Sequence, residues 1–396
     1  MMIGKRVLAT CALLLAVTIA AGADEAKPAA SNPYAQWKNG PPKDAGYFPI
    51  AVWLQDPANA ARYKSAGINV YVGLWQGPTA AQLAELKKNG MQVICDQNAV
   101  GLAHKDDPTI IGWMHGDEPD NAQELPGGKG YGQPILPSKI FAEYEAACKA
   151  DPSRPVLLNL GVGVAWDGWY GRNVPEKLRE TYAESQYVKG CDVVSFDIYP
   201  VASDDAAVKN KLDFVALGVE RLVKWTEGRK VVWNCIECAR IGGSGKATPK
   251  QVKAEVWMSL VHGSQGIIYF VHQFKPNFDE HSLLDDPEML AGVTALDNQI
   301  HELAPALNSP TIKDALKVES SNKAVPVAIM VKKEGGATYV FAVAMKPGET
   351  EATFALEGLP AGAQVEVLGE GRKIEPADGK FKDRFSNWDV HLYRIK

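Results

Sequence analysis

The chain has 396 residues, a formal net charge of −5 and 46% hydrophobic residues. This length exceeds one ordinary hydrophobic core and indicates a large domain combined with a smaller one. The acidic balance argues against nucleic acid or an anionic membrane surface as a partner, and no apolar run is long enough to span a membrane.

The N-terminus has the pattern of a secretory signal peptide. Lys5 and Arg6 precede a mostly apolar stretch over residues 7–21, and small residues up to Ala23 form a cleavage site. We therefore expect residues 1–23 to be removed on export, and the protein to be secreted or periplasmic. Residues 24–45 are rich in proline and are expected to form an extended leader.

From residue 46 onward, apolar strand patterns alternate with helical ones. The strand candidates are residues 48–54, 68–75, 91–95, 110–114, 156–160, 193–198, 231–236 and 266–271. Helical spacing is found at 58–66, 79–89, 138–150, 211–225 and 287–303, and Thr248, Pro249 and Gln251 are a strong helix start. Eight such alternations predict a (β/α)8 TIM barrel over residues 46–306. An open, doubly wound sheet is the alternative architecture.

After residue 309 the pattern changes to short strands separated by glycine, proline and charged turns. The strand candidates are residues 325–331, 337–345, 351–356, 363–368 and 390–395. This pattern of short strands and turns predicts a small C-terminal antiparallel β-sandwich domain over residues 310–396.

Two glutamates stand where apolar runs of the predicted barrel end. Glu118 follows the fourth run and Glu237 closes the seventh. Active residues of such barrels lie at the carboxyl ends of the strands. Two carboxyls facing each other there can cleave a glycosidic bond, because one protonates the leaving oxygen while the other attacks or activates water. In the structural alternative, Glu118 caps the next helix and Glu237 pairs with Arg240.

At these two strand ends the chain resembles the retaining glycoside hydrolases of the large (β/α)8-barrel clan. The motifs are Asp-Glu-Pro at residues 117–119 and Ile-Glu-Cys at residues 236–238. The resemblance implies a retaining β-glycosidase in which Glu118 is the acid/base, Glu237 is the nucleophile and Tyr199 lies beside the nucleophile. Asp117 replaces the usual asparagine, and an ionised carboxylate can only accept a hydrogen bond from the sugar.

Other polar and aromatic residues near the strand ends are candidates for binding a β-linked oligo- or polysaccharide. Indole rings stack on the flat C–H faces of sugars, and Trp166 and Trp169 are the preferred platform. Asp197, after the sixth strand, is interpreted as a structural residue. The predicted substrate-binding residues are Asp117, Tyr199, Asn159, Asn98, Trp75, Trp166, Trp169, Arg240 and Gln273.

Several other classes of site fit the sequence less well. The histidines form no metal-binding pattern, so we predict no metal or other cofactor. The glycine-rich segment 240–246 resembles a phosphate-binding loop and is interpreted as a flexible rim of the mouth. Cys235 and Cys238 are interpreted as buried thiols. The alternative function is a non-catalytic carbohydrate-binding barrel, which would keep the tryptophans without turnover; no oligomeric state is predicted.

Overall fold

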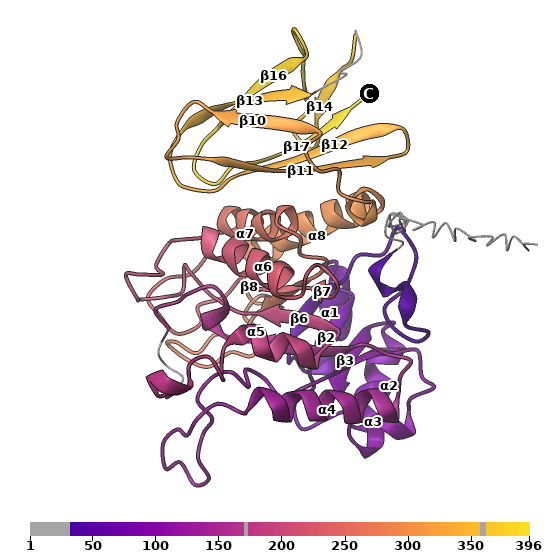
Figure 1. Ribbon diagram of the computed structural model, residues 1–396. Helices are drawn as coiled ribbons and strands as arrows, with labels where there is room; N and C mark the ends of the chain where they lie inside the picture. Colours follow the sequence, from indigo (N-terminus) through magenta and orange to yellow (C-terminus); the bar gives the residue numbers. More distant parts are fainter. Residues whose placement is uncertain (1–31, 170–172, 357–361) are drawn as a thin grey trace, which may run out of the picture.

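The computed structural model describes residues 32–169, 173–356 and 362–396, so the predicted signal peptide lies outside the described residues. The chain forms a barrel of strands and helices, followed by a β domain stacked on one side of it (Figure 1). In the described part of the chain, no helix has the length and apolar character needed to cross a membrane.

The barrel is a closed parallel sheet with eight strand positions. β1 pairs in parallel with β2 on one side and with β9 on the other, which closes the ring. β7 and β8 are two pieces of one strand interrupted at Trp233, so the nine pieces occupy eight positions. The pieces are β1 (Ile50–Trp53), β2 (Val70–Val72), β3 (Gln92–Asp96), β4 (Ile110–Met114), β5 (Val156–Leu160), β6 (Val193–Phe196), β7 (Val231–Val232), β8 (Asn234–Glu237) and β9 (Ile267–Phe270). The TIM barrel prediction is confirmed, and the open sheet is excluded.

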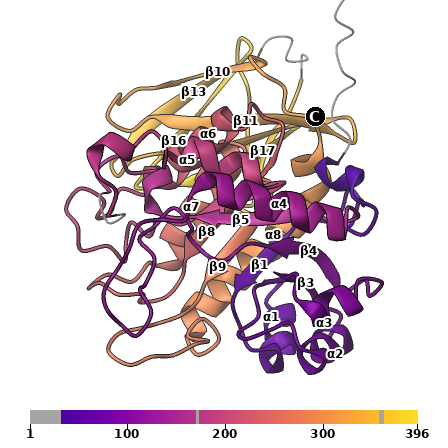
Figure 2. The same ribbon diagram turned by 60° about the horizontal axis from the view of Figure 1, so that its bottom comes forward.

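Helices pack around the outside of the strands (Figure 2). They are α1 (Ala60–Ser65), α2 (Ala80–Lys88), α3 (Ala99–Ala103), α4 (Pro137–Ala150), α5 (Glu184–Tyr187), α6 (Asp213–Trp225), α7 (Pro249–Val261) and α8 (Pro287–Asn308). The predicted start of α7 is present: the Thr248 hydroxyl accepts from the Gln251 N–H, and the Gln251 side chain accepts from the Thr248 N–H. This capping box satisfies backbone donors that the first helical turn leaves unpaired.

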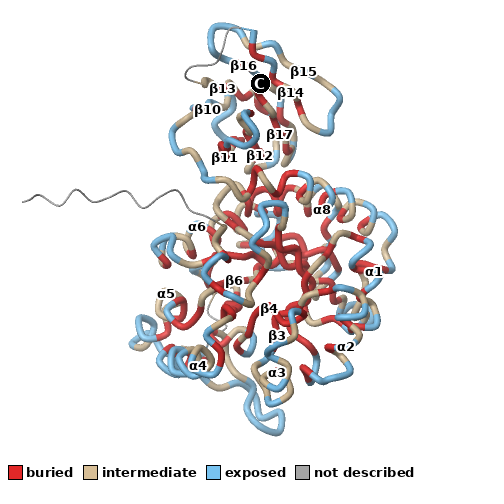
Figure 3. The backbone as a smooth tube through the Cα atoms, turned by 90° about the vertical axis from the view of Figure 1, so that its right-hand side faces the viewer, coloured by how far each residue is buried: buried red, intermediate tan, exposed pale blue. Residues whose placement is uncertain are grey.

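Side chains inside the barrel form a core of their own, closed at the amino ends of the strands by the leader. Figure 3 shows that burial is concentrated in the strands. Tyr34, in the short 3-10 helix Pro33–Gln36, is 1% exposed. Its hydroxyl accepts from Trp233 Nε1 at 2.8 Å and donates to the Gln265 carbonyl at 2.8 Å. The leader is therefore part of the barrel base.

The C-terminal domain consists of two antiparallel sheets around a separate hydrophobic core. One sheet contains β10 (Leu316–Ser320), β13 (Thr350–Leu356) and β16 (Lys380–Phe385). The other contains β11 (Val327–Glu334), β12 (Ala337–Ala344), β17 (Val390–Ile395), β14 (Val365–Val367) and β15 (Arg372–Ile374). The predicted sandwich is confirmed. β10, β15 and β16 were not among the strands predicted, because charged side chains interrupt their apolar alternation.

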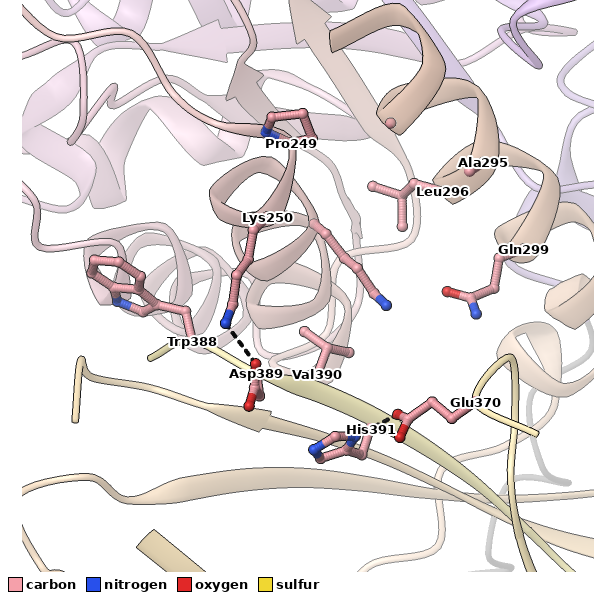
Figure 4. Close-up of a pocket in the computed structure, with 12 residues that line it drawn as sticks. Pro249, Lys250, Ala295, Leu296, Gln299, Glu370, Trp388, Asp389, Val390 and His391 are labelled. Atoms are coloured by element: carbon pink, nitrogen blue, oxygen red, sulfur yellow. Dashed lines mark hydrogen bonds and ion pairs between the residues drawn. The ribbon is translucent and has the colours of Figure 1, made fainter. Parts of the chain in front are cut away.

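Helices α7 and α8 carry the C-terminal domain. Trp257 of α7 stacks on Phe341 of β12, with ring centroids 5.2 Å apart. Lys250 pairs with Asp389 at 2.7 Å across a cavity of about 500 Å³ between the domains (Figure 4). An aromatic stack and an ion pair therefore join the two domains through the outer side of the barrel.

The base closure gives a stability prediction. Tyr34→Phe keeps the ring but removes the hydroxyl, so the Trp233 N–H loses its acceptor and the Gln265 carbonyl loses its donor. We expect unfolding to become easier by about 1–3 kcal/mol, the usual cost of unpaired buried polar groups. Denaturant unfolding measures this. Tyr131→Phe is the control, because Tyr131 is 66% exposed. If both variants lose the same free energy of unfolding, the Tyr34 hydroxyl does not stabilise the base of the barrel.

Candidate active site

Three carboxyl groups meet at the carboxyl ends of β4 and β6, and we call them the carboxyl cluster. β4 ends at Met114, and Asp117 and Glu118 follow it; Asp197 follows β6. Glu118 has a φ of +41°, in the left-handed region that residues other than glycine rarely adopt. This local turn lets two consecutive residues contribute to one site, although strict strand alternation would separate them. Strained backbone of this kind concentrates at functional sites.

The carboxyls of the cluster perturb one another's ionisation. The Glu118 carboxyl lies close enough to Asp197 to disfavour ionisation of the Asp197 carboxyl. The pKa of Asp197 lies well above its ordinary value, first because the carboxyl is buried and second because of the charge of Glu118. The pKa of Asp117 is raised to about 7, again by burial first and by Glu118 second. Burial and the neighbouring carboxyls therefore favour the protonated forms of Asp117 and Asp197.

A layer of hydrogen bonds fixes two of these carboxyls. Asn159 of β5 donates to Asp117 at 2.9 Å and accepts from the Ser195 hydroxyl at 2.7 Å. On the other side, the Asn121 amide donates to Glu118 at 2.7 Å. Asn121 in turn accepts from Trp169 Nε1 at 2.9 Å, so Trp169, one of the predicted sugar-stacking residues, is linked to Glu118 through one side chain.

Glu237, the carboxyl expected to face Glu118, makes its hydrogen bonds with the backbone of the loop after β6. Glu237 is fully buried, and its two carboxylate oxygens accept the backbone N–H groups of Val201 and Ala202 at 2.6 and 2.7 Å. The physical reason is a gap in the sheet, where the pairing between β6 and β7 ends at Val194 and Val232. Beyond that point no backbone ladder joins β6 to β8, and the two hydrogen bonds to the Glu237 side chain connect β8 to the loop after β6.

Glu237 lies against a second buried carboxyl, Glu255 of α7. Burial raises the pKa of Glu237 to about 7. The pKa of Glu255 is raised further above its ordinary value, by burial first and by the charge of Glu237 second. The neutral acid on Glu255 can therefore donate to Glu237. Arg240, the partner considered for Glu237 in the sequence, is exposed.

Two cavities open at the mouth beside the carboxyl cluster. One has a volume of about 680 Å³ and is lined by Asp117, Trp75 and aromatic side chains around Phe270. The other, of about 400 Å³, is lined by Tyr199, Trp166 and Trp169. The rings of Tyr199 and Phe270 contact each other at 5.2 Å between centroids, so they separate the two cavities.

The remaining predicted substrate residues are not placed equally well for binding. Asn98 caps α3, accepting from the Gly101 N–H and donating to the Pro78 carbonyl, so both ends of its amide are used. Gln273 donates to the Asn277 carbonyl at 3.4 Å. Arg240 has an exposed side chain on the rim. Neither Gln273 nor Arg240 lines the two mouth cavities.

Sequence reasoning did not include Asp197, Phe274 and Phe278 among the predicted site residues. Asp197 directly follows the sixth strand, so its position was a signal for the mouth. Asp197, interpreted from the sequence as a structural residue that orients its neighbours, lies next to Glu118. His272, Phe274 and Phe278 belong to a loop whose path the strand pattern does not encode.

One group of side chains in the described residues has metal-ligand spacing. Asp279, His281 and Asp285 offer ligand atoms within 4.8 Å of one another. His281 already contacts Asp279 at 3.7 Å and Asp285 at 3.3 Å, and Asp285 pairs with Arg62 at 3.2 Å. These ion pairs account for the cluster, and the prediction that no metal is needed stays a prediction.

Comparison with known proteins identifies the fold. No family model and no curated protein matches the sequence. The chain is similar to the solved structures of AmyP bound to maltose (TM-score 0.54, 10% identity, 88% of this chain and 96% of that one) and of an AmyP variant bound to maltotriose (TM-score 0.53, 10% identity, 89% and 97%). It is also similar to an α-amylase from Geobacillus thermoleovorans complexed with acarbose (TM-score 0.51, 12% identity, 91% and 99%). The chain therefore shares the architecture of these proteins over nearly its whole length.

The buried pair of Glu237 and Glu255 predicts a pH-dependent stability. Their pKa values are higher in the folded chain than the value near 4.5 of an unperturbed glutamate. The stabilisation from holding the protons is therefore complete below pH 4.5 and is lost as the pH rises through 7. Glu255→Gln removes one ionisation, so we expect it to match the wild type at pH 5 and to be more stable by about 1–3 kcal/mol at pH 8.

Urea unfolding at pH 5, 6, 7 and 8 measures this difference. The matched control is Glu302→Gln, an exposed position on α8, which should follow the wild type at every pH. A Glu255→Gln variant that loses as much stability as the wild type between pH 5 and pH 8 would show that the pair does not share a proton.

Proposed function

We propose that this protein is a glycoside hydrolase whose acid–base chemistry comes from the carboxyl cluster. The observation that carries the proposal is the meeting of Asp117, Glu118 and Asp197 at the barrel mouth, where burial raises the pKa values of Asp117 and Asp197 and where Asp117 lines a cavity of about 680 Å³. Carboxyls in contact that retain a proton at neutral pH supply both an acid and a carboxylate, the two groups that glycoside cleavage requires.

We assign the acid/base role to Glu118, as the clan resemblance implies, and transfer the role of its carboxylate partner from Glu237 to Asp197. Both oxygens of Glu237 are occupied by backbone donors, whereas Asp197 contacts Glu118 directly. The shared proton leaves one acid for the departing oxygen and one carboxylate for the sugar. The buried hydroxyl of Tyr199 lies beside Asp197 and lowers its pKa, so it can stabilise that carboxylate when it forms.

The proposed substrate is a β-linked oligo- or polysaccharide. The β linkage rests on the clan resemblance, and the size of the site rests on the two mouth cavities. Their volumes fall in the range typical of ligand sites, and their position on either side of the cluster suits sugar units before and after the scissile bond. The signal pattern of residues 1–23 leads us to propose that the enzyme acts after export.

Variants of the cluster test this assignment. Glu118→Gln and Asp197→Asn should each lower kcat/KM by about 10²–10⁴-fold, since each removes a proton-transfer group or its partner. Matched α- and β-aryl glycosides and a panel of soluble polysaccharides serve as substrates. Glu145→Gln, an exposed glutamate on α4, is the control and should keep full activity.

Two outcomes would contradict the proposal in different ways. If both cluster variants turn over a substrate as fast as the wild type, the cluster is structural. If the wild type binds saccharides from the panel but cleaves none, the protein is a non-catalytic carbohydrate-binding barrel. If only α-linked substrates are cleaved, the protein is a glycoside hydrolase but the proposed preference for β-linked substrates is wrong.

The stereochemistry of the product gives an independent test. The cluster is compact, and inversion needs carboxyls about 6.5–9.5 Å apart to leave room for water. We therefore expect net retention, with the first-formed sugar having the anomeric configuration of the substrate. NMR during the first minutes of the reaction distinguishes the anomers, and an inverted product would exclude Asp197 as the nucleophile.

A further inference from the structure

The larger mouth cavity has a wall of stacked aromatic rings. Phe270, His272, Phe274 and Phe278 contact one another, with ring centroids between 5.1 and 6.3 Å apart. Phe274 and Phe278 are 50% and 63% exposed, which is unusual for large apolar side chains. Trp75, which also lines the cavity, is 70% exposed. Such rings bind the C–H face of a sugar, and their faces also attract a cation.

The charged groups lining the same cavity are all acidic. Asp56, Asp117 and Glu280 contribute carboxyls, and no lysine or arginine is among the described residues that line the cavity. Asp56 accepts from the Ala58 N–H at 2.9 Å, and Glu280 accepts from the Asp56 N–H at 2.7 Å. Backbone groups therefore hold these two side chains, and neither has a basic partner within the described part of the chain.

The floor of the cavity adds an uncharged polar group. His272 is 7% exposed, and its Nδ1 atom has no hydrogen-bond partner in the described residues. Burial lowers the pKa of His272, which disfavours a positive charge on the imidazole. A buried nitrogen without a partner costs free energy, and His272 is one of the residues that line the cavity.

We propose that this cavity binds a sugar unit carrying a protonated amino group, so that the substrate is a glycan containing amino sugars. This inference rests on the proposed hydrolase function and specifies its substrate class. The ammonium group lies near Asp56 and Glu280 while the sugar face stacks on the rings, which combines charge attraction with cation–π contact. A uronic acid or sulfated sugar would meet the carboxylates of Asp56 and Glu280 without a counter-charge and would be rejected.

The test measures binding separately from cleavage. The probes are four β-1,4-linked tetrasaccharides with one backbone: the glucosamine tetramer, its N-acetylated form, the glucose tetramer and the glucuronic acid tetramer. At pH 5.5 and low salt, calorimetry with the wild-type chain should show the glucosamine tetramer binding at least tenfold more tightly than the glucose tetramer. The preference should shrink as salt rises, because screening weakens charge attraction.

A double variant identifies the groups responsible. Asp56→Asn with Glu280→Gln removes two charges, while each new amide can still accept the backbone hydrogen bond. It should reduce the preference for the glucosamine tetramer about tenfold and leave the affinity for the glucose tetramer unchanged. The matched control, Glu145→Gln with Glu302→Gln, changes the net charge equally at exposed sites and should keep the preference.

The outcomes separate this inference from the proposed function. Equal affinity for the glucosamine and glucose tetramers, or tighter binding of the glucuronic acid or N-acetylated tetramer, overturns the inference. The inference is also wrong if the control variant loses the preference for the glucosamine tetramer, because the net charge of the protein would then attract the ammonium groups. If the protein cleaves neutral glycans and shows no preference for the glucosamine tetramer, the proposed hydrolase function holds and the amino-sugar specificity is wrong. If it binds the glucosamine tetramer selectively but cleaves no glycan, the amino-sugar specificity holds and the hydrolase function is wrong.

Discussion

The carboxylate of Glu237 bridges a place where the barrel ladder stops early. β6 pairs with β7 only as far as Val194 and Val232, and the two hydrogen bonds from Glu237 to Val201 and Ala202 continue the connection to β8. The loop so fixed directly follows Asp197 and Tyr199. The position of the carboxyl cluster therefore depends on a buried charge elsewhere, and that charge is tolerable because it has two backbone donors and the acid of Glu255 beside it.

The closed parallel barrel explains how the site is assembled. Every strand delivers its carboxyl end to the same rim, so residues distant in sequence become neighbours. Asn159 links Asp117 to Ser195, and Asn121 links Glu118 to Trp169. Because these partners come from the strand ends and the loops after them, the carboxyls are held in place before any substrate arrives, which is the arrangement that catalysis favours.

Burial of carboxyl groups at the barrel mouth has a cost in stability. Burial raises the pKa of Asp117 to about 7 and that of Asp197 well above its usual range, so proton donors persist at neutral pH. The same burial means that ionising these groups at higher pH works against folding. The exposed rings of Trp75, Phe274 and Phe278 are a related compromise, since apolar surface open to water is retained where a ligand can cover it.

The sequence by itself determined the architecture, because the periods of apolar residues and the helix caps are local. The eight strand runs, the capping box at Thr248 and the change of pattern after residue 309 were all predictable. It also indicated Glu118 at the fourth strand end. Which carboxyl faces Glu118 was decided by the tertiary structure, through a gap in sheet pairing that no residue pattern records. Asp197 and Glu237 both end apolar runs, and only strand pairing and burial of the side chains direct the first to the mouth and the second into the wall.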